Sequence, residues 1–145
     1  MSFKCVAGDS TSIPMYCGTS SSVVAGDVVV FDVSTGAAVS PVIPATAALL
    51  SVNLAGVAIN TPAATDLWVN VIPNSGQLFE YDCTSTPTTA MLGKQNDLTS
   101  AGTVANSTTI SIAATGFVKN VAVVDATNKK MRGFLLGVNL PKALS

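Results

Sequence analysis

Two acidic residues separated by one position are the best candidates in this chain for acid–base chemistry. Glu80 and Asp82 lie in the segment "LFEYDC", and a strand there presents both carboxylates on one face. Paired carboxylates serve glycoside hydrolysis and calcium binding. Because hydrolytic carboxylates usually come from separate elements, we interpret this pair as solvated charge near a strand edge rather than as a catalytic dyad.

Other catalytic equipment is scarce in the sequence. There is no histidine, so the commonest general base and the Ser–His and Cys–His pairs are unavailable. Cys5, Cys17 and Cys83 form no C-x-x-C pair, and we expect free, buried thiols rather than a zinc site. The segment "AGDSTS" (residues 7–12) lacks the Gly-Lys-Ser/Thr ending of a phosphate loop, which favours an Asx-type turn. We therefore predict a protein that is not an enzyme, with no catalytic residues, no cofactor and no metal.

Basic residues cluster at one place in the sequence, at Lys129, Lys130 and Arg132. Three positive charges are too few for a nucleic-acid binder, which neutralises several phosphates from a basic face. We predict a solubilising hairpin tip, with docking on an acidic partner as the alternative. Asn106-Ser107-Thr108 is a formal glycosylation sequon, which we interpret as accidental because no secretory signal is recognised.

The composition is that of a folded chain with very little charge. Of 145 residues, 48% are apolar and only 10% are charged, the formal net charge is −1, and the mean hydropathy is +0.52. Disorder requires low hydrophobicity and high net charge, so it is excluded. Since charge usually keeps protein surfaces apart, we infer that much of this surface is covered by partners.

The sequence indicates neither secretion nor insertion into a membrane. The opening "MSFKCVAGDS" has no apolar core of a signal peptide, so we expect synthesis in a cytoplasm. The longest charge-free stretch, Val33 to Thr65, is interrupted by prolines and asparagines and never reaches about 18 continuous apolar residues. We predict no membrane span.

Short β-branched runs between turn residues predict a mainly β fold, either a small β-barrel or a β-sandwich, with an extended N-terminal segment. Two hairpins are expected, and single strands lie between them. The expected strands are Asp27–Val33 with Ala37–Ile43, Leu49–Ile59, Leu67–Ile72, Gln77–Cys83, Thr108–Ala113, and Phe117–Asp125 with Met131–Leu140. Residues 91–103 are expected to be irregular, and Pro44–Leu54 is the only candidate helix.

Strand alternation also predicts a core, although a slip of one residue inverts the face of a strand. The side chains expected to be mostly buried are Val28, Val30, Val33, Trp68, Val71, Phe79, Val121, Val123 and Leu135. The aromatic residues are spread about one per strand, which favours core anchors over a sugar-stacking surface.

The order of the segments resembles the small head decoration (cement) proteins of tailed bacteriophages. The resemblance covers roughly residues 23–140 and rests on "AGDVVVFDVSTGAAV", "LAGVAIN", "NSGQLFEYDC", "LGKQNDLTSAGT" with "NSTT", and "VAVVDATNKKMRGFLLGVNL". It includes glycines at expected turns and a Leu-Gly-Lys-x-x-Asp-Leu step after an acidic strand. The glycines are Gly26, Gly56, Gly76, Gly93 and Gly102.

This resemblance implies a β-rich structural protein on the outer surface of the capsid. Such proteins commonly form trimers that clamp neighbouring major capsid protein subunits and stabilise the expanded head, without a cofactor or catalytic residues. The implied partners are the coat protein and further copies of the chain, with no nucleic acid and no membrane. The implied location is the virion, after synthesis in the host bacterial cytoplasm.

Residues 1–24 are expected to form an N-terminal arm or anchoring segment, and residues 25–145 a β-rich decoration domain. The arm is expected to bridge to a neighbouring subunit, with closure of its own barrel as the alternative. Other functions also fit the sequence: a carbohydrate- or receptor-binding β-module of a phage fibre or head, or a head–tail or tail structural protein. A sugar-binding module should show exposed aromatic side chains clustered on one face.

Overall fold

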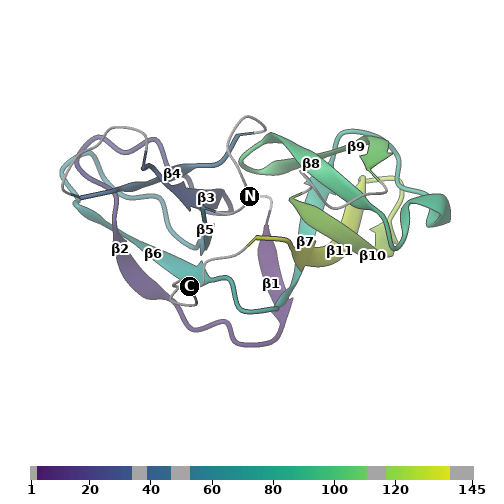
Figure 1. The fold of residues 1–145 in the computed structure, drawn as a ribbon, viewed down its shortest axis with the longest axis horizontal. Helices are drawn as coiled ribbons and strands as arrows, with labels where there is room; N and C mark the ends of the chain where they lie inside the picture. Colours follow the sequence, from purple (N-terminus) through teal and green to yellow (C-terminus); the bar gives the residue numbers. More distant parts are fainter. Residues whose placement is uncertain (1–2, 34–38, 47–52, 111–116, 138–145) are drawn as a thin grey trace.

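The computed structural model describes residues 3–33, 39–46, 53–110 and 117–137, which form a mainly β fold (Figure 1). The predicted fold class is confirmed, and its barrel form is the one observed. Eleven strands and one short 3-10 helix, η2 (Thr89–Met91), make up the described secondary structure. They form two parts, a five-stranded sheet and a closed barrel, which lie side by side in Figure 1.

The barrel closes through a parallel pairing between the strands that come first and third along the chain, which are the two ends of the sheet order. Its five strands are β7 (Leu78–Cys83), β8 (Gln95–Ser100), β9 (Thr103–Ile110), β10 (Val118–Asp125) and β11 (Lys130–Leu135), in the spatial order β7-β11-β10-β8-β9. The end of β7 pairs with β9, at Asp82 with Thr103 and at Cys83 with Val104. The beginning of the same β7 edge pairs with an additional strand, β1 (Lys4–Ala7).

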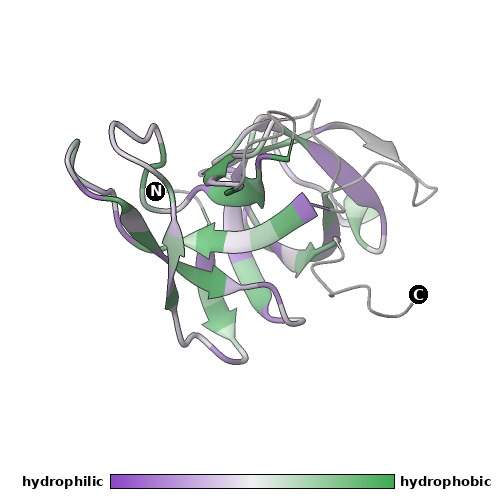
Figure 2. Ribbon diagram, turned by 60° about the vertical axis from the view of Figure 1, so that its left-hand side comes forward, coloured by the Kyte–Doolittle hydropathy of each residue, from purple (hydrophilic) through white to green (hydrophobic). Residues whose placement is uncertain are grey.

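The other part is an open antiparallel sheet in the order β2-β6-β5-β3-β4. Its strands are β2 (Ile13–Tyr16), β3 (Val28–Phe31), β4 (Val42–Pro44), β5 (Leu54–Ala58) and β6 (Trp68–Pro73). We call residues 8–77 the sheet half, and β1 with residues 78–137 the barrel half. In Figure 2, which turns the sheet half toward the viewer, hydrophobic residues dominate its strands.

A proline blunts each edge strand of the open sheet. The backbone of Asn70 is directed toward β5, since its carbonyl accepts from Ile59 and its N–H donates to Asn60. Pro14 pairs with Asn70 from the other side, so its own backbone is directed to the free edge, where it offers no N–H. Pro44 is placed in the same way on β4, opposite Val29. Prolines so placed hinder strand addition at both edges.

The two halves share one hydrophobic core. Val28, Val30, Leu54 and Val57 from the sheet belong to the same buried cluster as the barrel's aromatic and aliphatic side chains. The barrel's contribution includes Phe79, Tyr81, Leu98, Val104, Phe117, Val118, Met131 and Leu135. Backbone hydrogen bonds also cross between the halves, from Val28 N–H to the Ala101 carbonyl at 2.8 Å and from Phe3 N–H to the Gly26 carbonyl at 3.0 Å.

A second cluster covers the opposite face of the sheet, so the central strand β5 is buried on both faces. A bulge in β5 shifts its alternation, because Val29 pairs with Gly56 while Val30 pairs with Leu54, so Leu54 and Val57 both lie in the shared core. Gly56 has a φ of +154°, and a Cβ there would overlap the backbone carbonyl of Ile72 on β6. Glycine is therefore required for the close approach of these two strands.

Both predicted hairpins are confirmed, by the antiparallel pairs β3 with β4 and β10 with β11. The prediction of an irregular segment over residues 91–103 is wrong, because β8 runs through it and is paired on both sides. Its sequence "QNDLTS" is polar because Gln95 and Asn96 are buried amides rather than apolar core residues. Most of the candidate helix Pro44–Leu54 lies outside the described residues.

The predicted core is confirmed for Val28, Val30, Val71, Phe79 and Leu135, and Val123 is half-buried. It is wrong for three side chains that lie on the surface: Val33 (59% exposed), Trp68 (56%) and Val121 (43%). Val33 follows the end of β3. Trp68 lies at the start of β6, on the same face as the buried Ile72 but where the barrel does not cover the strand. Val121 is an extra residue in a bulge of β10, between Asn120 paired with Gly133 and Ala122 paired with Arg132.

The N-terminal segment contributes one strand to each half of its own chain. β1 pairs with β7, and β2 pairs with β6. Phe3 is buried in the shared core, where it stacks on Tyr81 with ring centroids 5.2 Å apart. These contacts lie within the chain, but the barrel itself closes between β7 and β9, and the bridge to a neighbouring subunit stays a prediction.

Candidate interaction surface

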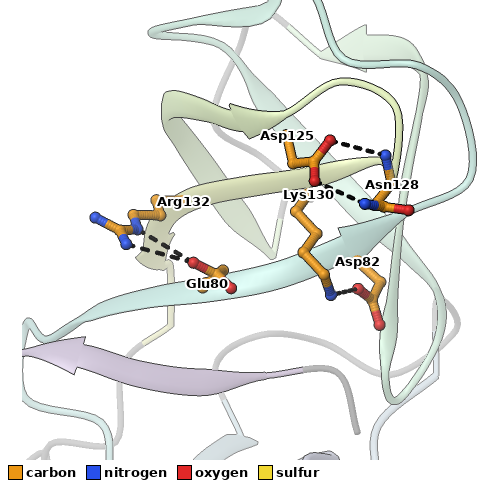
Figure 3. A network of polar contacts seen from close by, with 6 residues as sticks. All are labelled: Glu80, Asp82, Asp125, Asn128, Lys130 and Arg132. Carbon is orange, nitrogen blue, oxygen red and sulfur yellow. Dashed lines mark hydrogen bonds and ion pairs between the residues drawn. The ribbon is translucent and has the colours of Figure 1, made fainter.

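The two acidic residues singled out in the sequence are engaged in ion pairs on the outside of the barrel. Glu80 on β7 lies opposite Arg132 on β11, and Asp82 lies opposite Lys130 (Figure 3). These two pairs neighbour each other on the outer face of the strands. The Lys130 Nζ–Asp82 Oδ1 distance is 2.6 Å and the Arg132 Nε–Glu80 Oε1 distance is 3.4 Å. The acidic pair and the basic cluster thus form one cross-strand charge ladder.

The tip of the β10–β11 hairpin is closed by a carboxylate. Asp125 accepts hydrogen bonds from the backbone N–H and the side-chain amide of Asn128, at 3.0 and 2.7 Å. The Asn128 backbone hydrogen bond is the main cause that lowers the pKa of Asp125. The hydrogen bond to Asp82 raises the pKa of Lys130. The acidic side chains of β7 are thus each paired with a basic side chain of β11 across the strands.

Cys83, next to Asp82 of this ladder, carries an unreactive thiol. Cys83 is buried, and its pKa is raised to about 12 by desolvation, with the Asp82 carboxylate adding to the shift. A protonated, buried thiol is a poor nucleophile and a poor metal ligand. Within the described residues all three cysteines are free, and no group of three or more Cys, Asp or Glu is placed to hold a metal ion.

Inside the barrel, polar side chains bond mainly to one another and to the backbone. The Tyr81 hydroxyl donates to Asn120 Oδ1 at 2.8 Å, and Asn120 Nδ2 donates to Asn96 Oδ1 at 2.6 Å. Asn96 Nδ2 in turn donates to the Ala105 carbonyl at 3.1 Å. Gly133 leaves room for this network, since a Cβ there would overlap the Tyr81 hydroxyl and the Lys119 carbonyl. The network stabilises barrel closure, because unpaired buried amides are costly.

Two other sequence candidates have structural roles. Asp9 accepts a hydrogen bond from the Thr11 backbone N–H at 2.9 Å, which confirms the Asx-type turn in "AGDSTS". Asn106 of the sequon is fully buried, and its side-chain amide exchanges hydrogen bonds with the backbone of Ser85. A glycan on that amide is incompatible with the fold.

An aromatic pair on the sheet surface, with Trp68 exposed and Tyr16 half-buried, was not predicted from the sequence. Tyr16 on β2 lies opposite Trp68 on β6, and the two rings meet edge to face with centroids 5.8 Å apart. In the next register, Asn70 lies between Pro14 on β2 and Ile59 after β5. We call these five residues, Pro14, Tyr16, Ile59, Trp68 and Asn70, the platform. The platform lies on the same face of the sheet as Ile72, whose side chain is buried against the barrel.

Charge and exposed apolar side chains are divided unequally between the halves. The sheet half contains Asp9, Asp27, Asp32 and Asp66 and no lysine or arginine. Among the described residues, seven of its large hydrophobic side chains are exposed: Ile13, Val24, Val33, Val39, Ile59, Leu67 and Trp68. Among the described residues of the barrel half, only Val121, Val124 and Phe134 are so exposed, and all three lie on the β10–β11 hairpin. A surface with many exposed apolar side chains and no cation is typical of a protein contact.

Comparison with protein-family models, curated proteins and solved structures finds no match to this chain. Within the described residues, no helix has the length and apolar character needed to cross a membrane.

Proposed function

We propose that the chain is a non-enzymatic structural protein of a tailed bacteriophage. It binds the outer surface of the expanded head as a homotrimer and clamps neighbouring major capsid protein subunits. The observation that carries the proposal is the surface of the sheet half, which exposes seven large hydrophobic side chains and has no cation. Such a surface is poorly suited to water and well suited to burial against other proteins.

The clamp works through linkage. A protein that binds only the assembled lattice shifts it toward the intact form by RT ln(1 + [L]/Kd), about 2.7 kcal/mol per site at a hundredfold excess over Kd. Many weak sites on one shell add to a large effect, and multivalent contacts raise avidity by about 10² to 10⁴ over a single contact. A closed barrel joined to the sheet by one core provides a rigid body for such bridging.

The test is to strip the protein from full heads and to heat stripped and untreated heads side by side. Untreated heads are expected to release DNA at the higher temperature, and re-addition of the protein is expected to restore that temperature. Equal release temperatures would refute the clamp. An electron micrograph of the native particle separates the head from the head–tail and tail locations.

A second candidate function is a carbohydrate- or receptor-binding module of the particle. The Tyr16–Trp68 pair favours it, because the exposed Trp68 and the half-buried Tyr16 meet on one face, and aromatic side chains clustered on one face are expected of such a module. Binding of the intact protein to a glycan array, lost in Trp68→Ala and kept in the control Val33→Ala, would support this function. Binding to isolated heads with no glycan binding would support the clamp.

A further inference from the structure

The described residues carry two exposed apolar patches on different halves of the molecule. The platform lies on the sheet half. The other patch is the outer face of the β10–β11 hairpin, with Val121, Val124 and Phe134. On β11, Met131, Gly133 and Leu135 are buried, so Phe134 is directed outward with Lys130 and Arg132. Val121 and Val124 are the unpaired residues of two bulges in β10, which leave them exposed.

The surroundings of the two patches have opposite charge. Asp66 is exposed in the turn that leads into β6, two residues before Trp68, and the sheet half has no cation. The hairpin patch is bordered by Lys119, which pairs with Phe134, and by Lys129 at the tip. Across the outer face of β1, β7, β11 and β10, with the tip, five cations stand against three anions. The cations are Lys4, Lys119, Lys129, Lys130 and Arg132, and the anions are Glu80, Asp82 and Asp125.

We propose that the platform binds the outer face of the β10–β11 hairpin of a second copy of this chain. Contact between two platforms would bring two anionic sheet halves together, whereas platform on hairpin joins an anionic patch to a cationic one. Strand addition at the sheet edges is hindered by Pro14 and Pro44, so the contact is made by side chains. Trp68 and Tyr16 are the residue types that most often dominate binding energy.

A contact of this kind joins two different surfaces, so it is head-to-tail. Each copy then offers one free platform and one free hairpin, and repetition closes a ring if the rotation allows it. This inference rests on the part of the proposed function that has the chain self-associating. It names the surfaces of that association and leaves the remaining exposed side chains of the sheet half, such as Val33 and Val39, for the coat protein.

The experiment uses two full-length variants that each disable one patch. Trp68→Lys places a cation where the hairpin's cations would dock, and Phe134→Glu places an anion where the acidic sheet half would dock. Both side chains are exposed, so both variants are expected to keep the thermal unfolding temperature of the wild type. Val33→Lys and Thr99→Glu are the matched controls, because they make the same charge changes at exposed residues outside both patches.

Sedimentation velocity at low ionic strength is the measurement. The wild type and both controls are expected to form the ring, and each patch variant alone is expected to sediment as a monomer. A mixture of the two patch variants is expected to form a one-to-one dimer that does not grow, because it contains one intact platform–hairpin contact.

Three results would overturn the inference. The first is an oligomer of Phe134→Glu alone, which would indicate a contact between two platforms. The second is an oligomer of both variants, which would place the interface elsewhere. The third is a monomeric wild type, which would remove the trimer from the proposed function while the heating test of stripped heads still decides the clamp.

Discussion

The barrel half and the sheet half solve the problem of exposed strands in different ways. The barrel removes its edges by closure, holds amides inside, and carries a ladder of paired charges outside. The sheet stays open, blunts its edges with Pro14 and Pro44, and exposes uncharged apolar side chains. In the proposed function, the barrel is the part that stays in water and the sheet half is the part that partners cover.

The largest expected effect tests whether the two halves fold as one unit. Gly56→Ala forces a Cβ against the Ile72 carbonyl, and we expect a loss of about 3–5 kcal/mol in the free energy of unfolding. Because the core is shared, the near-ultraviolet circular dichroism of the aromatic side chains in both halves and the far-ultraviolet signal should be lost in one transition.

Gly76→Ala is the matched control for this variant. Gly76 also has a positive φ, +89°, but a Cβ there meets no atom within 4 Å. Only the backbone penalty of about 1 kcal/mol is expected. Equal losses for the two variants would contradict the close packing of β5 on β6.

The buried amides of the barrel are expected to give the next largest effect. Asn120→Ala removes the acceptor of the Tyr81 hydroxyl and the amide that donates to Asn96 Oδ1 in a buried site, at a cost of about 2–4 kcal/mol in denaturant unfolding. The control Asn128→Ala removes an exposed amide at the hairpin tip and should cost less than about 1 kcal/mol. If Asn120→Ala were neutral, the network would have no part in barrel stability.

The outer charge ladder is expected to contribute little. A double-mutant cycle on Asp82→Ala and Lys130→Ala should give a coupling of about 0.2–1 kcal/mol, since both side chains are more than one-third exposed. About 1 M salt should remove most of it. A coupling of several kcal/mol that resists salt would mean that the ladder is more than a solubilising surface.

The smallest expected effect concerns the pH dependence of the sheet half. Desolvation raises the pKa of Asp27, so the folded state holds this proton more tightly than the unfolded chain does. Its contribution to stability is full below the ordinary Asp pKa and is lost as pH rises through the raised value. Asp27→Asn should therefore be more stable than the wild type at pH 7, with the difference vanishing near pH 3.

Asp9→Asn is the opposite control for that comparison. Hydrogen bonds from Thr11 lower the pKa of Asp9, so its contribution is present above the ordinary Asp pKa and lost as pH falls. This variant should be the less stable one at pH 7. Chemical denaturation at both pH values decides, and a shift of the same sign in both variants would contradict the assignment.

Local patterns in the sequence predicted the β class, both hairpins and the Asx turn, because each depends on residues close together in the chain. The burial of Val33, Trp68 and Val121 was mispredicted because alternation does not show where a strand ends, where a neighbour stops covering it, or where a bulge shifts it. The ladder and the Tyr16–Trp68 pair join distant strands, and one sequence gives no register between them. The sequence does not predict the buried amides of β8, because a run of polar residues usually indicates an irregular surface segment.

Side-chain footprinting of the free protein and of the protein bound to heads tests the central claim most directly. Labelling of Val33 and Val39 is expected to fall on binding, since these exposed side chains of the sheet half, which lie outside the platform, become covered. Labelling at Lys94, which is exposed on the barrel half outside the hairpin patch, is expected to stay unchanged. Unchanged labelling of the sheet half together with protection at Lys94 would contradict the account.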